Sequence, residues 1–402
     1  MLNNTKALLS QKAACITPSL TLAITAKAKK MKSEGISIIG FGAGEPDFNT
    51  PAYIIDAAKK ALDVGFTKYT PSSGMPKLKE VICEKFKKDN GLIYSPSQII
   101  VSSGAKHSIF NVMQALIEEG DEVIIPAPYW LTYPEVVKMC DGTCVFVHAD
   151  ISNDYKATAE QIKAAITPKT KLLILNSPSN PTGAVYNKEE LEAIAKVVVE
   201  SGIYVLSDEI YEKLVYDGAV HYSIASLGED IKARTIVING VSKTYAMTGW
   251  RVGYLAAPLE IAKAIDSMQS HATSNACSIS QYATVVALSG GEDFISEMHN
   301  TFDERRKCMM KIIKGIDGLS CSNPKGAFYI MVDFSKLIGK KYKGVEIKNS
   351  IDFAEKLLTC GVAVVPGEAF AADNCVRLSY AISIEDIKEG LKRIKAFTME
   401  VV

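Results

Sequence analysis

The chain has 402 residues, of which 48% are hydrophobic and 22% charged, a composition typical of a soluble globular protein with room for two domains. Lys plus Arg and Asp plus Glu each total 45, so the formal net charge is zero. This balance argues against a nucleic-acid binder and against a membrane-surface protein, since both need a basic excess.

The cysteine and histidine patterns argue against a disulfide framework and a metal site. The nine cysteines are scattered without a C-x-x-C pair, and the five histidines lack metal-ligand spacing. We therefore expect reduced, mostly buried thiols and no metal. Residues 1–16 lack a signal-peptide core, and no later run approaches the ~20 apolar residues of a membrane span. The sequence predicts a cytoplasmic protein.

The first part of the chain predicts helices separated by polar loops. Residues 20–35 place apolar side chains at helical spacing opposite a lysine-rich face, with Gly35 as the C-cap. Further helices are expected over 53–64 and 75–90. Glycines at 40, 42 and 44 run G-x-G-x-G into Glu-Pro-Asp-Phe instead of a helix, so they are no dinucleotide fingerprint. They favour a turn that lets a substrate approach the backbone.

From residue 98 onward, short apolar strands alternate with amphipathic helices. The expected strands cover 98–101, 122–125, 143–147, 171–175, 203–206 and 235–238. The expected helices cover 108–117, 159–166 and 188–200. This alternation predicts an α/β fold whose central, mainly parallel sheet is flanked by helices on both faces.

The pattern changes after about residue 290. A long charged helix is expected over 292–316, followed by a strand over 326–334 and a helix over 350–360. Two strands, over 362–365 and 376–380, and a last helix over 384–397 complete the chain. We expect a large α/β domain over 48–290. The N-terminal segment 1–47 and the C-terminal part 291–402 would form a smaller α+β domain.

One lysine stands among small residues in the segment 239–253, directly after a predicted strand. Lys243 has room for a planar group, and its amine can form a Schiff base with an aldehyde if its pKa falls from about 10.4. Arg251, held in a compact turn between Gly249 and Gly253, offers a guanidinium fork suited to phosphate. Pyridoxal 5'-phosphate (PLP) is an aldehyde that carries a phosphate, so this segment suggests a PLP site. The alternative is that the segment is an ordinary surface turn.

Polar residues also follow the neighbouring strands. Asp208 stands at a strand's C-terminal end, where ligands bind in open α/β sheets, and a carboxylate there keeps a pyridine nitrogen protonated. Tyr211 can then reach the ring's phenolic oxygen. The alternative is that Asp208 caps a helix and Tyr211 is a core residue. Asn180, before a proline in an extended turn, presents an amide to the ring oxygen and to a substrate carboxylate, unless it serves only the turn.

Three further features have both a functional and a structural interpretation. Gly104, Ala105 and Lys106 open a helix and offer N–H groups to a phosphate, although many helices begin this way without a ligand. Trp130 follows a strand and can stack on a pyridine ring or fill the core. Arg377 lies inside an apolar strand and either holds an α-carboxylate or faces solvent.

Taken together, these motifs resemble, in order and over nearly the whole chain, the class I and II PLP-dependent aminotransferases of fold type I. The resemblance is closest to aspartate aminotransferases of the bacterial and archaeal type. The matching segments are 43–48 (AGEPDF), 68–69, 128–130, 180–183, 207–211, 243–251, 326–329 and 377–380.

The resemblance implies a role for each candidate residue. Lys243 forms the Schiff base with PLP and carries a proton between Cα and C4', Asp208 pairs with the pyridinium, Tyr211 and Asn180 with the ring oxygen, and Trp130 stacks on the ring. The phosphate site would comprise Arg251, the backbone of Gly104, Ala105 and Lys106, and Tyr69 from the neighbouring subunit of a homodimer. Ser242 is a further candidate for the phosphate site, but its role is open. Some relatives carry a phosphate-binding serine three residues before the lysine, where this chain has Gly240. Arg377, Trp130, Asn180 and the backbone near Gly44 would bind the substrate.

The expected activity is transfer of an amino group from an L-amino acid, first of all aspartate, to 2-oxoglutarate in a ping-pong reaction through pyridoxamine phosphate. Lys106 is our candidate for the distal carboxylate, with a solvated lysine as the alternative. Other amino acids, prephenate and a PLP-dependent carbon–sulfur β-lyase reaction remain open. A sensor domain of a transcription regulator would need a basic helix-turn-helix segment, for which we expect no room before residue 20.

Overall fold

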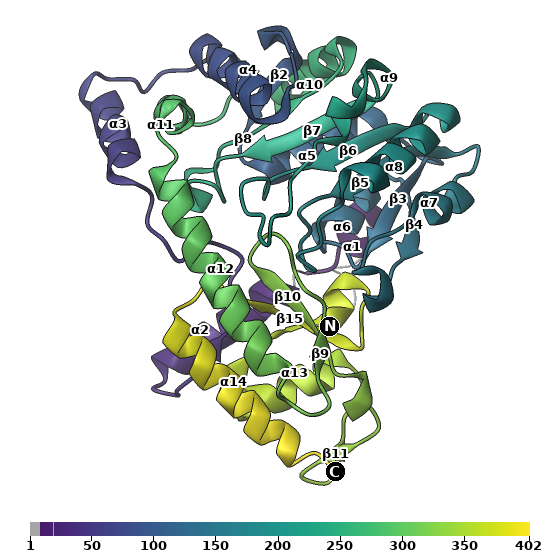
Figure 1. The fold of residues 1–402 in the computed structure, drawn as a ribbon. Coiled ribbons are helices and arrows are strands. Elements are labelled where there is room, and N and C mark those ends of the chain that lie inside the picture. Colours follow the sequence, from purple (N-terminus) through teal and green to yellow (C-terminus); the bar gives the residue numbers. More distant parts are fainter. Residues whose placement is uncertain (1–8, 19) are drawn as a thin grey trace.

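A seven-stranded sheet organises the larger part of the molecule (Figure 1). The computed structural model describes residues 9–18 and 20–402 and orders the strands β2-β8-β7-β6-β5-β3-β4. Their bounds are β2 (Ile99–Ser102), β3 (Glu122–Ala127), β4 (Thr143–His148), β5 (Thr170–Asn176), β6 (Tyr204–Asp208), β7 (Thr235–Gly240) and β8 (Gly253–Ala256). Strands β3 to β7 pair in parallel, and β8 runs antiparallel to both of its neighbours. The predicted mainly parallel α/β sheet is confirmed.

Helices cover both faces of this sheet because successive strand residues point to opposite sides. In β5, Leu172 and Ile174 pack with α5 (Ala105–Leu116), α6 (Thr132–Met139) and α10 (Leu259–Ala272). Leu173 and Leu175 pack with α7 (Ala159–Ala165), α8 (Lys188–Ser201) and α9 (Glu229–Lys232). Helices α3 (Ala52–Asp63), α4 (Pro76–Asn90) and α11 (Ser278–Ser289) pack near β2 and β8.

The C-terminal part builds a second, antiparallel sheet ordered β14-β15-β10-β9. Its strands are β9 (Ser320–Cys321), β10 (Tyr329–Asp333), β14 (Val365–Pro366) and β15 (Cys375–Ser379), and β11 (Lys341–Tyr342) and β12 (Val345–Glu346) form a separate hairpin. The helices around it are α12 (Asp293–Ile313), α13 (Ser350–Thr359) and α14 (Ile384–Met399), with α12 running from the larger part into the smaller one (Figure 1).

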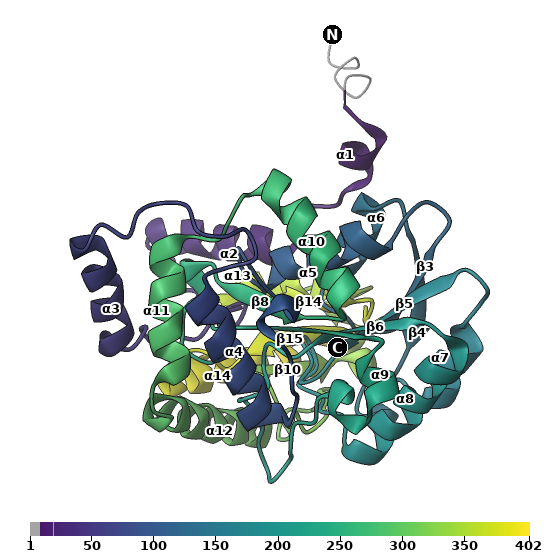
Figure 2. The same cartoon turned by 90° about the horizontal axis from the view of Figure 1, so that it is seen from above.

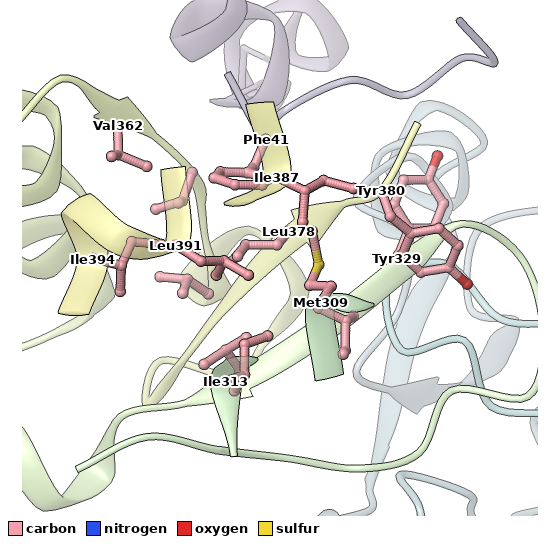
Figure 3. Close-up of a cluster of buried hydrophobic side chains, with 14 of the residues drawn as sticks. Phe41, Met309, Ile313, Tyr329, Val362, Leu378, Tyr380, Ile387, Leu391 and Ile394 are labelled. Carbon is pink, nitrogen blue, oxygen red and sulfur yellow. The ribbon is translucent and has the colours of Figure 1, made fainter. Parts of the chain in front are cut away.

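The N-terminal segment packs against this C-terminal part. Strand β1 (Ile39–Gly40) pairs in parallel with β13 (Val362–Ala363), after helix α2 (Leu20–Ser33). Figure 3 shows Phe41 beside Leu378 of β15 and Ile387 and Leu391 of α14 in one buried cluster. Helix α1 (Gln11–Cys15) lies at the edge of the molecule near α6 (Figure 2). The proposed domain limits remain a prediction from the sequence.

Several local predictions need correction. Helix α5 begins at Ala105 and not at 108, since Gly104 takes the N-cap position with a φ of 94°. The strand expected over 362–365 is two short strands in different sheets, and the one expected over 326–334 is shortened to β10 because Ala327 has a φ of 58°. Strand β8 and helices α6, α10 and α11 were not predicted.

The cysteine prediction is partly wrong. All nine cysteines are free, but only Cys140 and Cys375 are buried, and Cys15 and Cys277 are exposed. Within the described residues, every helix is too short or too polar to cross a membrane.

Candidate functional site

A cavity of about 590 Å³ opens where β5, β6 and β7 end. Its walls bring together most of the residues predicted from the sequence: Gly44, Ala105, Lys106, Trp130, Asn180, Asp208, Tyr211, Ser242, Lys243, Arg251 and Arg377. Gly104 lies behind the wall against Arg251. Tyr69 is not brought to the cavity of its own chain; its side chain is 89% exposed.

The amine of Lys243 projects into this cavity from the turn after β7. Its Nζ donates a hydrogen bond of 2.6 Å to the carbonyl oxygen of Gly44. Desolvation lowers the pKa of Lys243 to about 8. The negative charge of Glu45 raises this pKa, and the positive charge of Arg251 lowers it further. A larger fraction of this amine than of an ordinary lysine is therefore neutral, and so nucleophilic, near physiological pH.

Asp208, the last residue of β6, faces the same cavity. Its Oδ2 accepts a hydrogen bond of 2.8 Å from the hydroxyl of Tyr133, and its Oδ1 accepts one of 3.3 Å from the backbone N–H of Ile210. Burial raises the pKa of this carboxyl to about 6, and the bond from Tyr133 opposes the rise. Residues 210–213 form turns, so Asp208 caps no helix. Among the described residues this buried carboxylate makes no salt bridge, although Lys243 attracts it, so it is suited to a positively charged ligand.

Tyr133 was missed from the sequence. It lies three residues after Trp130, near the start of α6, and the two rings meet edge to face at 5.5 Å. Trp130 is only partly buried and lines the cavity, so it is not simply a core residue. Nothing in the sequence pairs Tyr133 with Asp208, because their contact depends on how α6 packs across the sheet.

The guanidinium of Arg377 is enclosed by protein, which excludes a solvent-facing role. Its Nη1 donates a 2.9 Å hydrogen bond to Asn180 Oδ1, its Nη2 donates a 3.3 Å bond to Gly42 O, and the group lies 4.3 Å from the centre of the Tyr329 ring. Its Nε has no partner among the described residues. The hydroxyls of Tyr329 and Tyr211 lie 3.0 Å apart nearby. The cavity thus has a fixed cation at this end.

Positive groups also gather at the other end, where α5 begins. Arg251 packs so closely on Gly104 that a Cβ there would lie 2.4 Å from Nη2. Its Nη1 donates a 2.8 Å bond to Thr248 O, which leaves the guanidinium beside the positive end of the α5 dipole. Lys106 Nζ lies 4.9 Å from the Trp130 ring, and burial, followed by the charge of Arg251, lowers its pKa. Such a cluster of positive groups is suited to a phosphate.

Two lysines of α2 complete the wall in a way the sequence did not indicate. Lys29 and Lys32 belong to the predicted lysine-rich face, yet both line the cavity while remaining exposed. The lining thereby holds more cationic side chains than carboxylates, of which Asp208 and Glu45 are present. A locally positive cavity in a chain of zero net charge favours anionic ligands.

Comparison with known proteins gives a consistent result. The family described as aminotransferase class I and II matches residues 36–394. An aspartate aminotransferase of Bacillus sp. is 51% identical over 98% of this chain and 99% of its own length. An aspartate/prephenate aminotransferase of Cereibacter sphaeroides is 46% identical over 97% of this chain and 98% of its own.

Solved structures agree with these relatives. The aspartate aminotransferase of Rhizobium meliloti superposes with a TM-score of 0.95 at 44% identity, over 98% of this chain and 99% of that one. That of Thermus thermophilus with maleate has a TM-score of 0.92 at 41% identity, over 97% of this chain and 99% of that one. This chain belongs to the class I and II aminotransferase family.

Proposed function

We propose that this chain is a PLP-dependent aminotransferase that moves the amino group of L-aspartate to 2-oxoglutarate. The observation that carries the proposal is the cavity itself, in which the amine of Lys243, with its pKa lowered to about 8, lies with the buried Asp208 between two cationic ends. The names of the relatives support aspartate as the donor, and the maleate bound to one of them, a dicarboxylate, supports an acidic substrate.

The residues present fit PLP. Arg251 and the backbone of Gly104, Ala105 and Lys106 would hold the phosphate, because a Cβ on Gly104 would fill the space where the guanidinium packs. Asp208 would face the ring nitrogen, and Tyr211 and Asn180 the ring oxygen. Trp130 and Ser242 line the same wall. Trp130 would stack on the ring, and Ser242 would be a further polar neighbour.

PLP, when bound, supplies an aldehyde that condenses with amines and a ring that withdraws electrons from the substrate Cα. Lys243 would hold the cofactor through its amine, and its Nζ, once free, would move a proton between the substrate Cα and C4'. Asp208, when ionised, would keep the ring nitrogen of the cofactor protonated. Trp130 and Tyr211 line one side of the site and would limit the access of water there.

The substrate α-carboxylate would bind the guanidinium of Arg377, which Asn180 and Gly42 already fix in place. Arginine suits this task because its planar fork matches a carboxylate. Trp130 and the backbone near Gly44 would close the site around the substrate. A dicarboxylate needs a second cation, and Lys106, on the cavity wall beside Trp130, is the candidate.

Replacing Lys106 by alanine tests this selectivity. We expect kcat/KM for aspartate to fall about 10- to 100-fold, the effect of losing one charged contact, while that for alanine changes little. The control is Lys156→Ala, since Lys156 pairs with Glu190 away from the cavity. An equal loss for both amino acids would remove Lys106 from distal-carboxylate recognition.

Tyr133→Phe should act through Asp208. Without the hydroxyl, the pKa of Asp208 should rise beyond about 6, because burial then acts with one less opposing hydrogen bond. We expect kcat/KM to fall about tenfold and the acid side of its pH profile to move to higher pH. Tyr186→Phe is a matched control, because that buried hydroxyl bonds Ala157 O away from the cavity. An unchanged acid limb would contradict this role.

We further propose a cytoplasmic homodimer in which Tyr69 reaches the phosphate site of the neighbouring subunit. The 89% exposure of Tyr69 supports a role outside its own chain, and the nine free cysteines support a reducing compartment. The domain limits 48–290, and 1–47 with 291–402, are kept as a proposal, supported by the separate sheets of the two parts.

An assay of the full chain with PLP separates the candidate activities. Aspartate and 2-oxoglutarate should yield oxaloacetate and glutamate. Prephenate is the second acceptor to try, since several relatives are named aspartate/prephenate aminotransferases. Pyruvate and ammonia released from a sulfur amino acid without any 2-oxo acid would instead identify a β-lyase and contradict the proposal.

A further inference from the structure

Two glutamine side chains lie fully enclosed near the loop that follows Tyr69. Gln269 of α10 and Gln281 of α11 have no exposed surface. An amide that is removed from water destabilises the fold unless each of its polar atoms is hydrogen-bonded. Both amides are fully engaged, and their partners show what they connect.

Gln269 joins the loop to the strand that leads to α5. Its Nε2 donates bonds of 2.7 Å to Ser72 O and 2.9 Å to Val101 O. Its Oε1 accepts bonds of 2.6 Å from Ser102 Oγ and 2.9 Å from Asn111 Nδ2 of α5. Ser102 ends β2, and the next carbonyl, that of Ser103, accepts a 3.4 Å bond from Arg251. One side chain therefore contacts both the loop and the base of the proposed phosphate site.

Gln281 holds the two ends of the loop. Its Nε2 donates a 3.0 Å bond to the hydroxyl of Thr70, the residue directly after Tyr69, and a 2.8 Å bond to Ala276 O. Its Oε1 accepts a 2.8 Å bond from the N–H of Met75. The residues on either side of 71–74, Thr70 through its hydroxyl and Met75 through its N–H, are thereby bonded to one helix.

The loop also lies directly on β2. Ser73 O accepts a 2.9 Å hydrogen bond from Val101 N, and Gly74, at a φ of 108°, sits so close to Val101 that a Cβ would lie 2.6 Å from its Cγ2. The loop that begins directly after Tyr69 is thus held at several points, although Tyr69 itself is 89% exposed. A rigid loop that presents an exposed tyrosine is suited to placing its hydroxyl at a defined point on another subunit.

We propose that Gln269 and Gln281 are positioning residues that fix Tyr69 relative to the phosphate end of the cavity in the same subunit. Tyr69, which would reach the neighbouring subunit, and the N-terminus of α5 in its own subunit would then be held in a fixed relative position. The inference rests on the proposed function, because it takes Tyr69 as a phosphate ligand of the neighbouring site. It adds a physical link between the phosphate sites of the two subunits through these two buried amides.

The test is a double-mutant cycle on the full chain, with the dissociation constant of PLP as the readout. Gln269→Met and Tyr69→Phe should each raise this constant about tenfold, the effect of one lost hydrogen bond to a charged group. Because both changes remove the same contact, the dissociation constant of the double variant should rise by much less than the product of the two single increases. Gln114→Met, on α5 but bonded to Cys140, is the control and should keep the original constant.

A second measurement addresses the tether without the cofactor. Thr70→Val removes one bond to Gln281 at a half-buried position and should leave the fold intact. Amide hydrogen exchange at Met75 and Val101 should then be faster in Thr70→Val and in Gln269→Met than in the unmodified chain. Unchanged exchange in folded variants would overturn the tether.

The outcomes separate the two proposals. An unmodified chain that binds no PLP contradicts the proposed function. A chain that binds PLP, but in which the effects of Gln269→Met and Tyr69→Phe multiply, contradicts only the coupling. The coupling is supported if the two effects on PLP binding do not multiply and amide hydrogen exchange at Met75 and Val101 is faster.

Discussion

Replacing Lys243 by alanine is expected to lower kcat/KM for aspartate by about 10⁴-fold or more, because one amine provides both the attachment point and the proton carrier. The amine already lies within 2.6 Å of Gly44 O at the cavity wall, and desolvation lowers its pKa to about 8. Steady-state kinetics with saturating PLP measure the effect.

The matched control is Lys263→Ala, an exposed lysine of α10 paired with Glu260. It should retain the original kcat/KM. A Lys243→Ala variant within tenfold of the unmodified protein would mean that another group moves the proton, and the account of the cavity would be wrong.

Asp208→Asn is expected to cost about 3–5 kcal/mol of transition-state stabilisation, or roughly 10²–10⁴-fold in kcat/KM. An amide cannot hold a proton on the ring nitrogen, whereas the carboxylate facing the cavity can. Glu209→Gln is the comparison, because Glu209 is equally buried but bonds Ser207, Ser223 and His221 instead of lining the cavity. A loss at Glu209 as large as that at Asp208 would contradict the assigned role.

Asp208→Asn should also stabilise the cofactor-free protein. The pKa of Asp208 rises from 3.8 to about 6 on folding, so between these values the folded state binds more protons than the unfolded chain. Stability therefore falls as pH rises through this window, and the cost is complete above about 6. At pH 7 the cofactor-free Asp208→Asn variant should have the higher Tm, and the difference should vanish below pH 3.8. A lower Tm at pH 7 would contradict this sign.

The sheet and the chemistry at its strand ends could be predicted because they depend on local pattern. Apolar runs such as that of β7 mark buried parallel strands, and Asp208 and Lys243 are recognisable by their position after such strands. Strand β8 escaped prediction because it begins with a glycine, which weakens a strand pattern. The start of α5 was placed too late because Gly104 caps it without a side chain.

The missed site residues share a different cause. Tyr133, Lys29 and Lys32 reach the cavity only through the packing of α6 and α2 on distant segments. A lysine-rich helix face normally indicates solvent, and nothing local distinguishes Lys29 from its neighbours. The buried state of Arg377 likewise depends on Asn180, which is 197 residues away in sequence. Pairwise contacts of this kind need the fold before they can be seen.

The central claim is most directly tested by the visible absorption spectrum of the purified full-length protein supplied with PLP, before and after L-aspartate is added. We expect an imine band that gives way to the band of pyridoxamine phosphate and returns with 2-oxoglutarate. A band that ignores aspartate would contradict the proposed donor, and the absence of any imine band would contradict the cofactor and the role of Lys243 together.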